Sequence, residues 1–350
     1  MFRHQTLLLA PLALLGLLAF LFGMSGREPV ISRWGANLAA STKLDVPAAQ
    51  GLSGIAEPMR AVALPVADGT AGDRQAFQPA GNLIEATTDH QAALYRQAVG
   101  GGELLYIVAS LGEPLHLQVI TANGAIPASD ATGDTIWRDG GRHLQSVAAM
   151  AAAPHALHQA QVPLGALAFS FHGAERTSPE GSVVINGVVH RVNAGRGTLC
   201  IRPDNSAAIG LFSAEELAGC AQAIGGGPMM LWQGKIANPD INAATDEFLP
   251  FNPLNEDFVQ LDWRIKVYRG GYPKTAVCVG DHPDGRSFLV LAVSNGVTGV
   301  DFARALRDMG CHSALGGDDD TSTQLVWRGK PLLGSNRPVP DALAIYHPAP

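Results

Sequence analysis

The chain has 350 residues, of which 47% are hydrophobic and 16% are charged, and its formal net charge at pH 7 is −7. This length and apolar content are enough for a sizeable core, in one large domain or two small ones. The negative charge, without any basic stripe interleaved with aromatic residues, gives no support to nucleic-acid binding.

The N-terminus has the layout of a secretory signal, in which a basic start is followed by an apolar run and then by small residues. The apolar run covers residues 7–22 and contains Pro11, so it is shorter than the roughly 20 residues of a membrane-spanning helix. Residues 1–26 are therefore predicted to be a signal peptide, with an uncleaved signal anchor as the alternative. The protein is expected to be periplasmic or secreted, touching the membrane only through this segment if it stays uncleaved.

The next part of the chain is predicted to be a leader or tether. Residues 27–95 are rich in Ala, Gly, Pro and Thr and show no sustained periodicity. Strand-like apolar runs begin at residues 104–109 and 115–121, and the second run ends at the turn signal Asn123-Gly124. Residues 96–350 are accordingly predicted to form the folded domain.

A strand predicted over residues 164–171 leads directly into ionisable side chains. His172, Glu175 and Arg176 follow it within five residues. Such side chains at the end of a buried strand are well placed for acid/base chemistry and for anion binding. His172 and Glu175 are therefore a candidate acid/base pair, and the alternative is a strand end with solvated charges.

Four cysteines in an exported chain allow three disulfide pairings. They are Cys200, Cys220, Cys278 and Cys311. Cys220 and Cys278 also fit buried free thiols, because each lies in an apolar pattern. Both interpretations stay open, and no Cys/His spacing indicates zinc.

The centre of the chain is predicted to alternate helix, strand and loop. Ser213 and Glu216 have the spacing of a capping box, and the helix that they start is predicted to run to the glycines at 225–227, which permit close approach of a ligand or another strand. Residues 237–270 are interpreted as a long surface loop. Residues 274–280 and 287–294 are predicted to form a hairpin, buried on both faces because both runs are continuously apolar.

Reactive polar groups are densest in residues 313–323. Phe302, Ala305, Leu306 and Met309 have the spacing of an amphipathic helix before this stretch, and residues 324–327 resemble a strand after it. Between them stand the three carboxylates of Asp318, Asp319 and Asp320 and the hydroxyls of Thr321, Ser322 and Thr323. The triplet indicates either a functional site or a solvated turn, because these residue types also make ordinary turns.

Several stretches, in this order, resemble the phosphodiester glycosidase family, which includes the lysosomal uncovering enzyme and bacterial exopolysaccharide-associated proteins. The resemblance covers roughly residues 100–346. The stretches that carry it are 225–231 with Gly234-Lys235, 274–277 with 284–286, 298–310 with 313–317 and 321–323, and 336–339 with Ala342-Leu343. The chain departs from the family pattern at 169–173, which lacks the Asn of an Asn-Gly-Gly-Phe stretch. It departs again at 316–320, where two glycines precede three aspartates, and at Lys274, which replaces an Arg.

The resemblance and the patterns together predict an α+β fold with a mixed, largely antiparallel sheet and flanking helices. They imply an exported hydrolase that cleaves a sugar phosphodiester or related glycoside in cell-envelope polysaccharide. The acid/base or nucleophile would be one of Asp318, Asp319 and Asp320. The substrate-binding residues would be Lys274 and Arg337 for the phosphate, Asn295 and Thr321 for the sugar, and Ser322.

No cofactor is expected, and the alternative is Ca²⁺ or Mg²⁺ held by the acidic triplet. The rival hypothesis is a non-catalytic envelope module of the same fold that binds polysaccharide or a partner protein.

Overall fold

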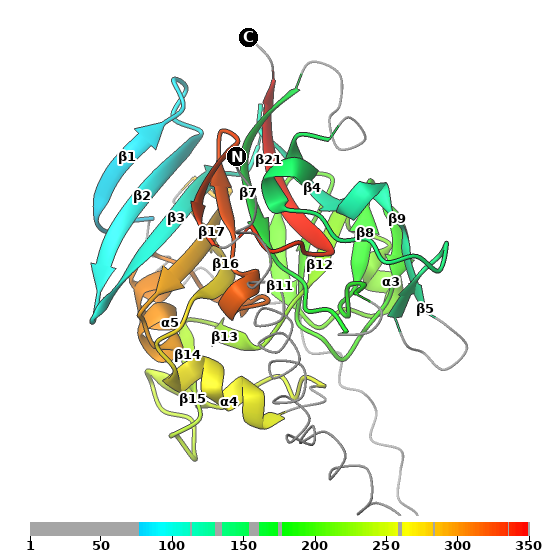
Figure 1. Cartoon of the computed structure of the whole chain (residues 1–350). Coiled ribbons are helices and arrows are strands. Elements are labelled where there is room, and N and C mark those ends of the chain that lie inside the picture. The colour runs from blue at the N-terminus through cyan, green and yellow to red at the C-terminus, as the bar shows by residue number, and fades with distance from the viewer. Residues whose placement is uncertain are drawn as a thin grey trace, which may run out of the picture. The chain divides into compact units, whose positions relative to one another are not determined.

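The computed structural model of the chain describes residues 77–112, 114–129, 135–153, 161–173, 177–257, 261–282, 284–334 and 336–348. Strands dominate these ranges, in one nine-stranded, two five-stranded and one two-stranded sheet. The predicted α+β fold is therefore corrected to a mostly β fold, in which helices are few and short (Figure 1). No helix within these ranges is both long and apolar enough to cross a bilayer. The predicted signal, residues 1–26, lies outside them.

The largest sheet has the strand order β1-β2-β3-β17-β16-β18-β13-β14-β15. Its strands are β1 (Asn82–Ala86), β2 (Ala92–Val99), β3 (Gly102–Ser110), β13 (Met229–Trp232), β14 (Lys235–Asn238), β15 (Phe248–Pro250), β16 (Lys274–Asp281), β17 (Ser287–Asn295) and β18 (Ser313–Gly316). Only β14 and β15 pair in parallel among these neighbours. The sheet is thus mixed and largely antiparallel, as the sequence predicts.

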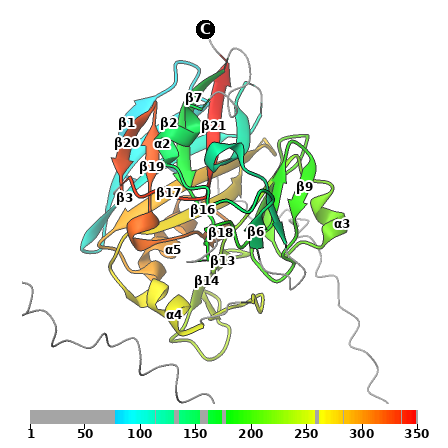
Figure 2. The ribbon, with the colours of Figure 1, turned by 45° about the vertical axis from the view of Figure 1, so that its right-hand side comes forward.

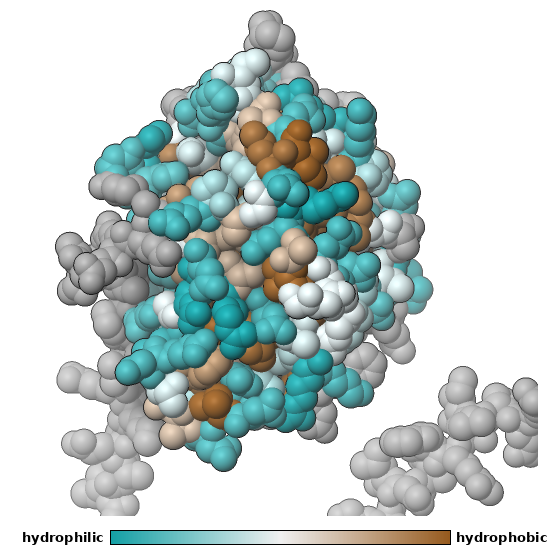
Figure 3. Space-filling model, turned by 90° about the vertical axis from the view of Figure 1, so that its left-hand side faces the viewer, coloured by the Kyte–Doolittle hydropathy of each residue, from teal (hydrophilic) through white to brown (hydrophobic). Residues whose placement is uncertain are grey.

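β1 and the first half of β2 lie within residues 27–95, which the sequence assigns to a leader. β1 is the edge strand, and its apolar residues Leu83 and Ile84 are exposed. Figure 3 views this side of the molecule, where hydrophobic patches lie among hydrophilic residues. Because so little of β1 is buried, its sequence carries no strand periodicity. Residues 82–95 nevertheless belong to the sheet.

The central strands are buried on both faces. In β3, Leu105 and Ile107 join the core between the sheets, whereas Leu104 and Tyr106 pack toward helix α5 (Gly299–Asp308). β16 and β17 show the same two-sided burial, which confirms the prediction from their continuous apolar runs. The predicted helix is also confirmed, because α5 begins at the N-cap Thr298 and buries its apolar face.

Two five-stranded sheets complete the main core. One has the order β20-β19-β7-β21-β4, with β4 (His116–Thr121), β7 (Gln161–Ala168), β19 (Leu325–Trp327), β20 (Lys330–Leu333) and β21 (Asp341–Pro348). The other has the order β11-β10-β12-β8-β9, with β8 (Val183–Ile185), β9 (Val188–Arg191), β10 (Thr198–Ile201), β11 (Ala207–Gly210) and β12 (Gln222–Gly225). Figure 2 labels β9, the edge strand of this sheet. Leu167, Leu199 and Leu291 belong to one buried cluster, so all three large sheets share a core.

The remaining elements are short. They are the two-stranded sheet of β5 (Pro127–Ser129) and β6 (Thr135–Trp137), the helices α2 (Val147–Ala151), α3 (Ala214–Leu217) and α4 (Leu261–Arg269), and the 3-10 helices η2 (Ala122–Gly124) and η3 (Asp320–Ser322). The segment 237–270, which the sequence assigns to a surface loop, thus contains β15 and α4. Its helix escapes the pattern because α4 is only weakly amphipathic.

The helix predicted from Ser213 to Gly225 is only partly correct. The capping box is present, because the Ser213 N–H donates to Glu216 Oε2 at 2.7 Å. The helix ends at Leu217, however, and β12 pairs with β10. A disulfide from Cys200 to Cys220 fixes this return, and a second joins Cys278 to Cys311, with Cα–Cα distances of 5.6 and 5.9 Å. All four cysteines therefore form disulfides, and none is a free thiol.

Candidate active site

The acidic loop joins two sheets at one place. Gly317 N donates to Thr275 O of β16 at 3.0 Å, and Asp318 N donates to Phe169 O, just beyond β7, at 2.7 Å. β21 begins beside the same end of β7, because Ala342 pairs with Ala168. Strand ends from two sheets therefore hold the backbone of Asp318 from both sides.

Close backbone packing makes this arrangement depend on glycine. A Cβ on Gly317 would lie 2.7 Å from Phe169 O, the carbonyl that binds Asp318. On the other side, Gly227 N donates to Gly316 O at 2.8 Å. The glycine run at 225–227 thus approaches another strand, which is one of the two roles that the sequence leaves open.

His172, Asp318 and Asp341 form an ionisable cluster around this point. Asp318 Oδ2 lies 3.3 Å from His172 Nδ1, and these side chains are 16% and 8% exposed, respectively. This contact is an ion pair only when His172 is protonated, and it is not a hydrogen bond, because His172 Nδ1 has no hydrogen-bond partner of suitable geometry. The sequence places His172 and Asp318 in separate candidate groups, and the structure brings them together.

Asp341 lies beneath this pair at the start of β21. It is 0% exposed, its Oδ1 accepts a hydrogen bond from Ser170 N at 3.0 Å, and its Oδ2 is buried without a partner. Burial raises the pKa of Asp341 to about 6, opposed by the Ser170 hydrogen bonds and by the charge of His172, and reinforced by the charge of Asp318. A proton on Asp341 is thus coupled electrostatically to both partners.

Asp319 contacts a different residue, Tyr272. The Tyr272 hydroxyl donates to Asp319 Oδ2 at 3.4 Å. The carboxylate also attracts the ammonium of Lys274, and this attraction raises the pKa of the lysine against a larger desolvation effect. Adjacent residues of the loop therefore present carboxylates to two separate environments, one at His172 and one at Tyr272.

Lys274 is a structural cation in this structure and does not fit the predicted role of phosphate ligand. It is 1% exposed, and its Nζ donates to Gly270 O and, at 2.8 Å each, to Tyr272 O and Val297 O. These three bonds use all the donors of an ammonium group. Burial lowers the pKa of Lys274 to about 8.

The other predicted residues lie in different places. Asp320 begins η3 and is exposed, with φ +56°. Thr321 and Arg337 meet at the surface, where Arg337 Nη1 donates to Thr321 Oγ1 at 2.5 Å, whereas Ser322 is buried. Asn295 is exposed at the end of β17, opposite Glu103, and no contact joins it to the acidic loop among the described residues.

Glu175, the predicted partner of His172, lies outside the described residues. A different ion pair supports this region. Glu180 N donates to Phe171 O at 2.9 Å, and Glu180 Oε2 lies 2.9 Å from Nη2 of the buried Arg196. This pair fixes the backbone around His172.

No group of three or more His, Cys, Asp or Glu side chains is arranged for metal binding within the described ranges. The three carboxylates of the triplet explain this, because Asp318, Asp319 and Asp320 point to different surroundings. The arrangement therefore gives no support to the Ca²⁺ or Mg²⁺ alternative.

Sequence reasoning missed Asp341, Ser170 and Tyr272. Asp341 directly precedes the apolar run 342–346, so an ionisable residue at a strand end was a usable signal, as it was for His172. Tyr272 offers no such signal, because only the fold brings it to Asp319.

Comparison with known protein families shows which family this chain belongs to. The sequence profile described as phosphodiester glycosidase matches residues 164–346, just over half of the chain. The chain belongs to the phosphodiester glycosidase family. This confirms the resemblance seen in the sequence, and the matched region contains every residue of the cluster around Asp318. No curated protein sequence matches the chain.

Solved structures show the same fold. A hypothetical protein from Synechocystis aligns with a TM-score of 0.56 at 13% identity, over 77% of this chain and 64% of that one. This chain therefore spans less than two thirds of that protein. The zebrafish N-acetylglucosamine-1-phosphodiester alpha-N-acetylglucosaminidase catalytic domain, auto-inhibited by its pro-peptide, aligns with a TM-score of 0.50 at 15% identity, over 79% of this chain and 86% of that one. At such low identities these likenesses concern the fold alone.

Proposed function

We propose that the protein is an exported hydrolase that cleaves the bond between a sugar and a phosphate, or a related glycosidic bond, in cell-envelope polysaccharide. Membership of the phosphodiester glycosidase family supports the reaction class. The signal-like N-terminus and the two disulfides support export, because disulfides persist in oxidising compartments.

The observation that carries the proposal is the pair of adjacent carboxylates, each held by its own partner. Most glycoside hydrolases use two carboxyl groups, one for proton transfer and one as nucleophile or charge stabiliser. Asp318 contacts His172, a residue suited to proton transfer near neutral pH. Asp319 lies near the cation Lys274 and accepts from Tyr272. We assign proton transfer to the Asp318–His172 pair and the anionic role to Asp319.

Asp341 takes the part of a positioning residue. It is fully buried and cannot touch substrate, but its charge acts on both His172 and Asp318. An ionised Asp341 carboxylate attracts positive charge at His172 and repels the Asp318 carboxylate, and a neutral Asp341 does neither. The buried carboxyl therefore tunes the electrostatics of the Asp318–His172 pair.

The test is hydrolysis of a panel of sugar 1-phosphodiesters by the purified protein, with and without Ca²⁺ or Mg²⁺. Asp318→Asn and Asp319→Asn should each lower kcat at least a hundredfold, the low end of the general acid–base contribution. Asp320→Asn is the matched control, expected to change kcat less than threefold, because Asp320 is exposed on the turn. Well-folded wild-type protein that releases no sugar from any substrate would favour the non-catalytic binding module instead.

A further inference from the structure

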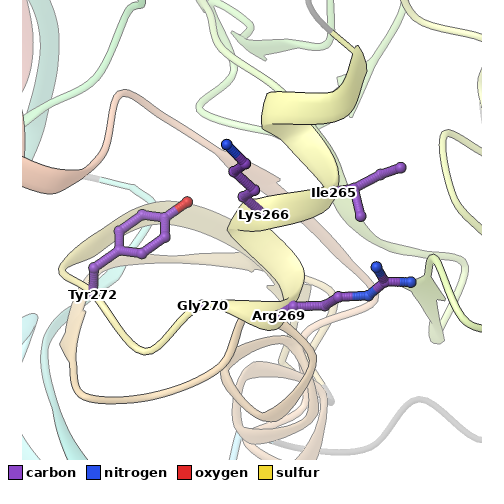
Figure 4. A pocket seen from close by; sticks show the side chains of 5 residues that line it. All are labelled: Ile265, Lys266, Arg269, Gly270 and Tyr272. Atoms are coloured by element: carbon purple, nitrogen blue, oxygen red, sulfur yellow. The ribbon is translucent and has the colours of Figure 1, made fainter.

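A shallow pocket lies at the end of α4, beside the acidic loop. Its volume is about 360 Å³, which is near the lower end of the roughly 300–1,000 Å³ of ligand pockets, so it suits a small ligand. The residues that line it are Ile265, Lys266, Arg269, Gly270 and Tyr272 (Figure 4). Two contacts hold the acidic loop against this segment, because the Tyr272 hydroxyl donates to Asp319 Oδ2 and Asp320 N donates to Pro273 O at 2.8 Å.

The charged groups around the pocket do not favour an anion. Arg269 Nη2 forms an ion pair with Asp240 Oδ1 at 2.5 Å. Lys266 also has an interaction partner, and the ammonium of Lys274 donates to three backbone carbonyl groups. The carboxylate of Asp319 repels negative charge. The ligand that fits this pocket is therefore uncharged.

Tyr272 gives the pocket an aromatic wall that is held in place. A Cβ on Gly270 would lie 2.7 Å from Tyr272 Cδ1 and still closer to Cε1, so the ring packs directly on the glycine. Lys274 Nζ lies 4.2 Å from the ring centroid, which is a cation–π contact. Figure 4 shows Arg269 pointing away from this ring. Contacts with the ring and with the hydroxyl thus fix the orientation of Tyr272.

A sugar ring matches this wall and its polar end. One face of a pyranose carries apolar C–H groups, and its edge carries hydroxyl groups. The tyrosine ring offers apolar surface for the face, and Ile265 adds to that surface. At the tyrosine hydroxyl stands the partly exposed carboxylate of Asp319, and a carboxylate can accept several hydrogen bonds from hydroxyl groups.

The pocket lies on the side of the loop away from the proton-transfer pair. Asp318 contacts His172, whereas the next residue, Asp319, contacts Tyr272. A sugar at Tyr272 would have its reacting carbon beside Asp319, to which the anionic role is assigned. The leaving group would then lie toward Asp318 and His172, which transfer the proton.

We propose that this pocket binds the uncharged sugar whose bond is cleaved, with Tyr272 as its stacking wall and Asp319 as the acceptor of its hydroxyl groups. This inference rests on the proposed function, and it assigns the sugar to Tyr272 in place of Asn295.

The test is a titration of the purified protein with glucose, galactose, mannose and N-acetylglucosamine, and separately with inorganic phosphate. At least one sugar should shift the backbone amide resonances of Gly270 and Gly271 in a saturable way, and phosphate should not. Tyr272→Ala should weaken the binding of that sugar about tenfold, as expected for a lost aromatic stack, and Tyr272→Phe, which keeps the ring, less than twofold. Leu83→Ala is the control, because it removes an exposed apolar side chain from β1, and it should leave the affinity unchanged.

Three results would reject the proposal: no saturable shift with any sugar, a saturable shift with phosphate, or equal affinities of the wild type and Tyr272→Ala. If thermal unfolding shows that Tyr272→Ala does not fold, Gly270→Ala takes its place, because its Cβ would press on the ring and should weaken binding in the same way.

The titration needs no turnover, so it separates this inference from the proposed function. Protein that binds a sugar through Tyr272 but hydrolyses no substrate refutes the proposed function alone. Protein that hydrolyses a substrate but binds its sugar equally well without the Tyr272 ring refutes this inference alone.

Discussion

Asp341 and Asp318 are both aspartates of one cluster, but burial gives them different roles. Asp341 is 0% exposed and is held by Ser170, whereas part of Asp318 reaches solvent beside His172. Lys274 shows the same effect, because full burial and three carbonyl partners turn a predicted phosphate ligand into a structural cation. For a single residue, the residue type indicates a possible role, and the burial and contacts of the side chain decide whether it can perform that role.

The raised pKa of Asp341 predicts a pH dependence of stability. Its pKa is about 6 in the fold against 3.8 normally, so between these values the folded protein binds more protons than the unfolded chain. The resulting stabilisation, on the order of 3 kcal/mol, is fully present below the lower value and is lost as pH rises through 6. Urea unfolding from pH 4 to 7 should show this loss in the wild type but not in Asp341→Asn, and parallel profiles would contradict the prediction.

The close contact at Gly317 predicts that adding a single methyl group there lowers the stability of the fold. In Gly317→Ala the new Cβ would press on Phe169 O, which should cost about 1–3 kcal/mol of unfolding free energy and displace Asp318. Gly101→Ala is the matched control, because a Cβ at Gly101 would meet no other atom within 4 Å, and it should change stability by less than about 0.5 kcal/mol. Thermal unfolding and hydrolysis rates measure both, and equal stability of the two variants would count against this packing.

Between elements, the two disulfides add covalent links between segments that backbone hydrogen bonds also join. One joins Cys200 of β10 to Cys220, which lies between α3 and β12. The other joins Cys278 of β16 to Cys311, between α5 and β18. The second bond therefore fixes the helix that leads into the strand before the acidic loop.

Removing these bonds should lower stability by amounts that follow loop length. The sequence separations are 20 and 33 residues, and the chain-entropy relation gives about 3 to 4 kcal/mol for each, with the larger value for Cys278–Cys311. Each Cys pair replaced by Ser should show this loss in urea unfolding under oxidising conditions. Under reducing conditions the wild type should approach the variants, and unchanged stability of a variant would show that its bond contributes nothing.

For the whole molecule, one buried carboxylate links two sheets. Glu256 Oε1 accepts from Gly197 N, next to β10, at 3.0 Å, and Oε2 accepts from Met229 N of β13 at 2.7 Å. Asn252 holds the backbone of Glu256 on both sides, at 2.6 and 2.9 Å. The segment before α4 thus ties the nine-stranded sheet to a five-stranded sheet.

Truncating Glu256 should therefore weaken the whole fold. Glu256→Ala leaves two buried N–H groups unpaired and should cost about 2–5 kcal/mol, and Glu256→Gln, which keeps one acceptor, should cost less. Glu247→Ala is the control, because the Glu247 side chain forms ion pairs at the surface with Arg304 and Arg307, worth at most about 1 kcal/mol. Urea unfolding ranks the three, and a loss in Glu256→Ala no larger than in Glu247→Ala would refute the link.

The sequence by itself determined the family, the hairpin of β16 and β17, helix α5 and the acidic loop that follows it. These features depend on local periodicity, caps and turns, which a short stretch of chain encodes. Only the tertiary structure decided that Asp318 faces His172, that Asp341 lies beneath them and that Lys274 is buried. Those facts depend on solvent exposure and on contacts between residues far apart in the chain, because strand order brings such residues together and no local pattern records it.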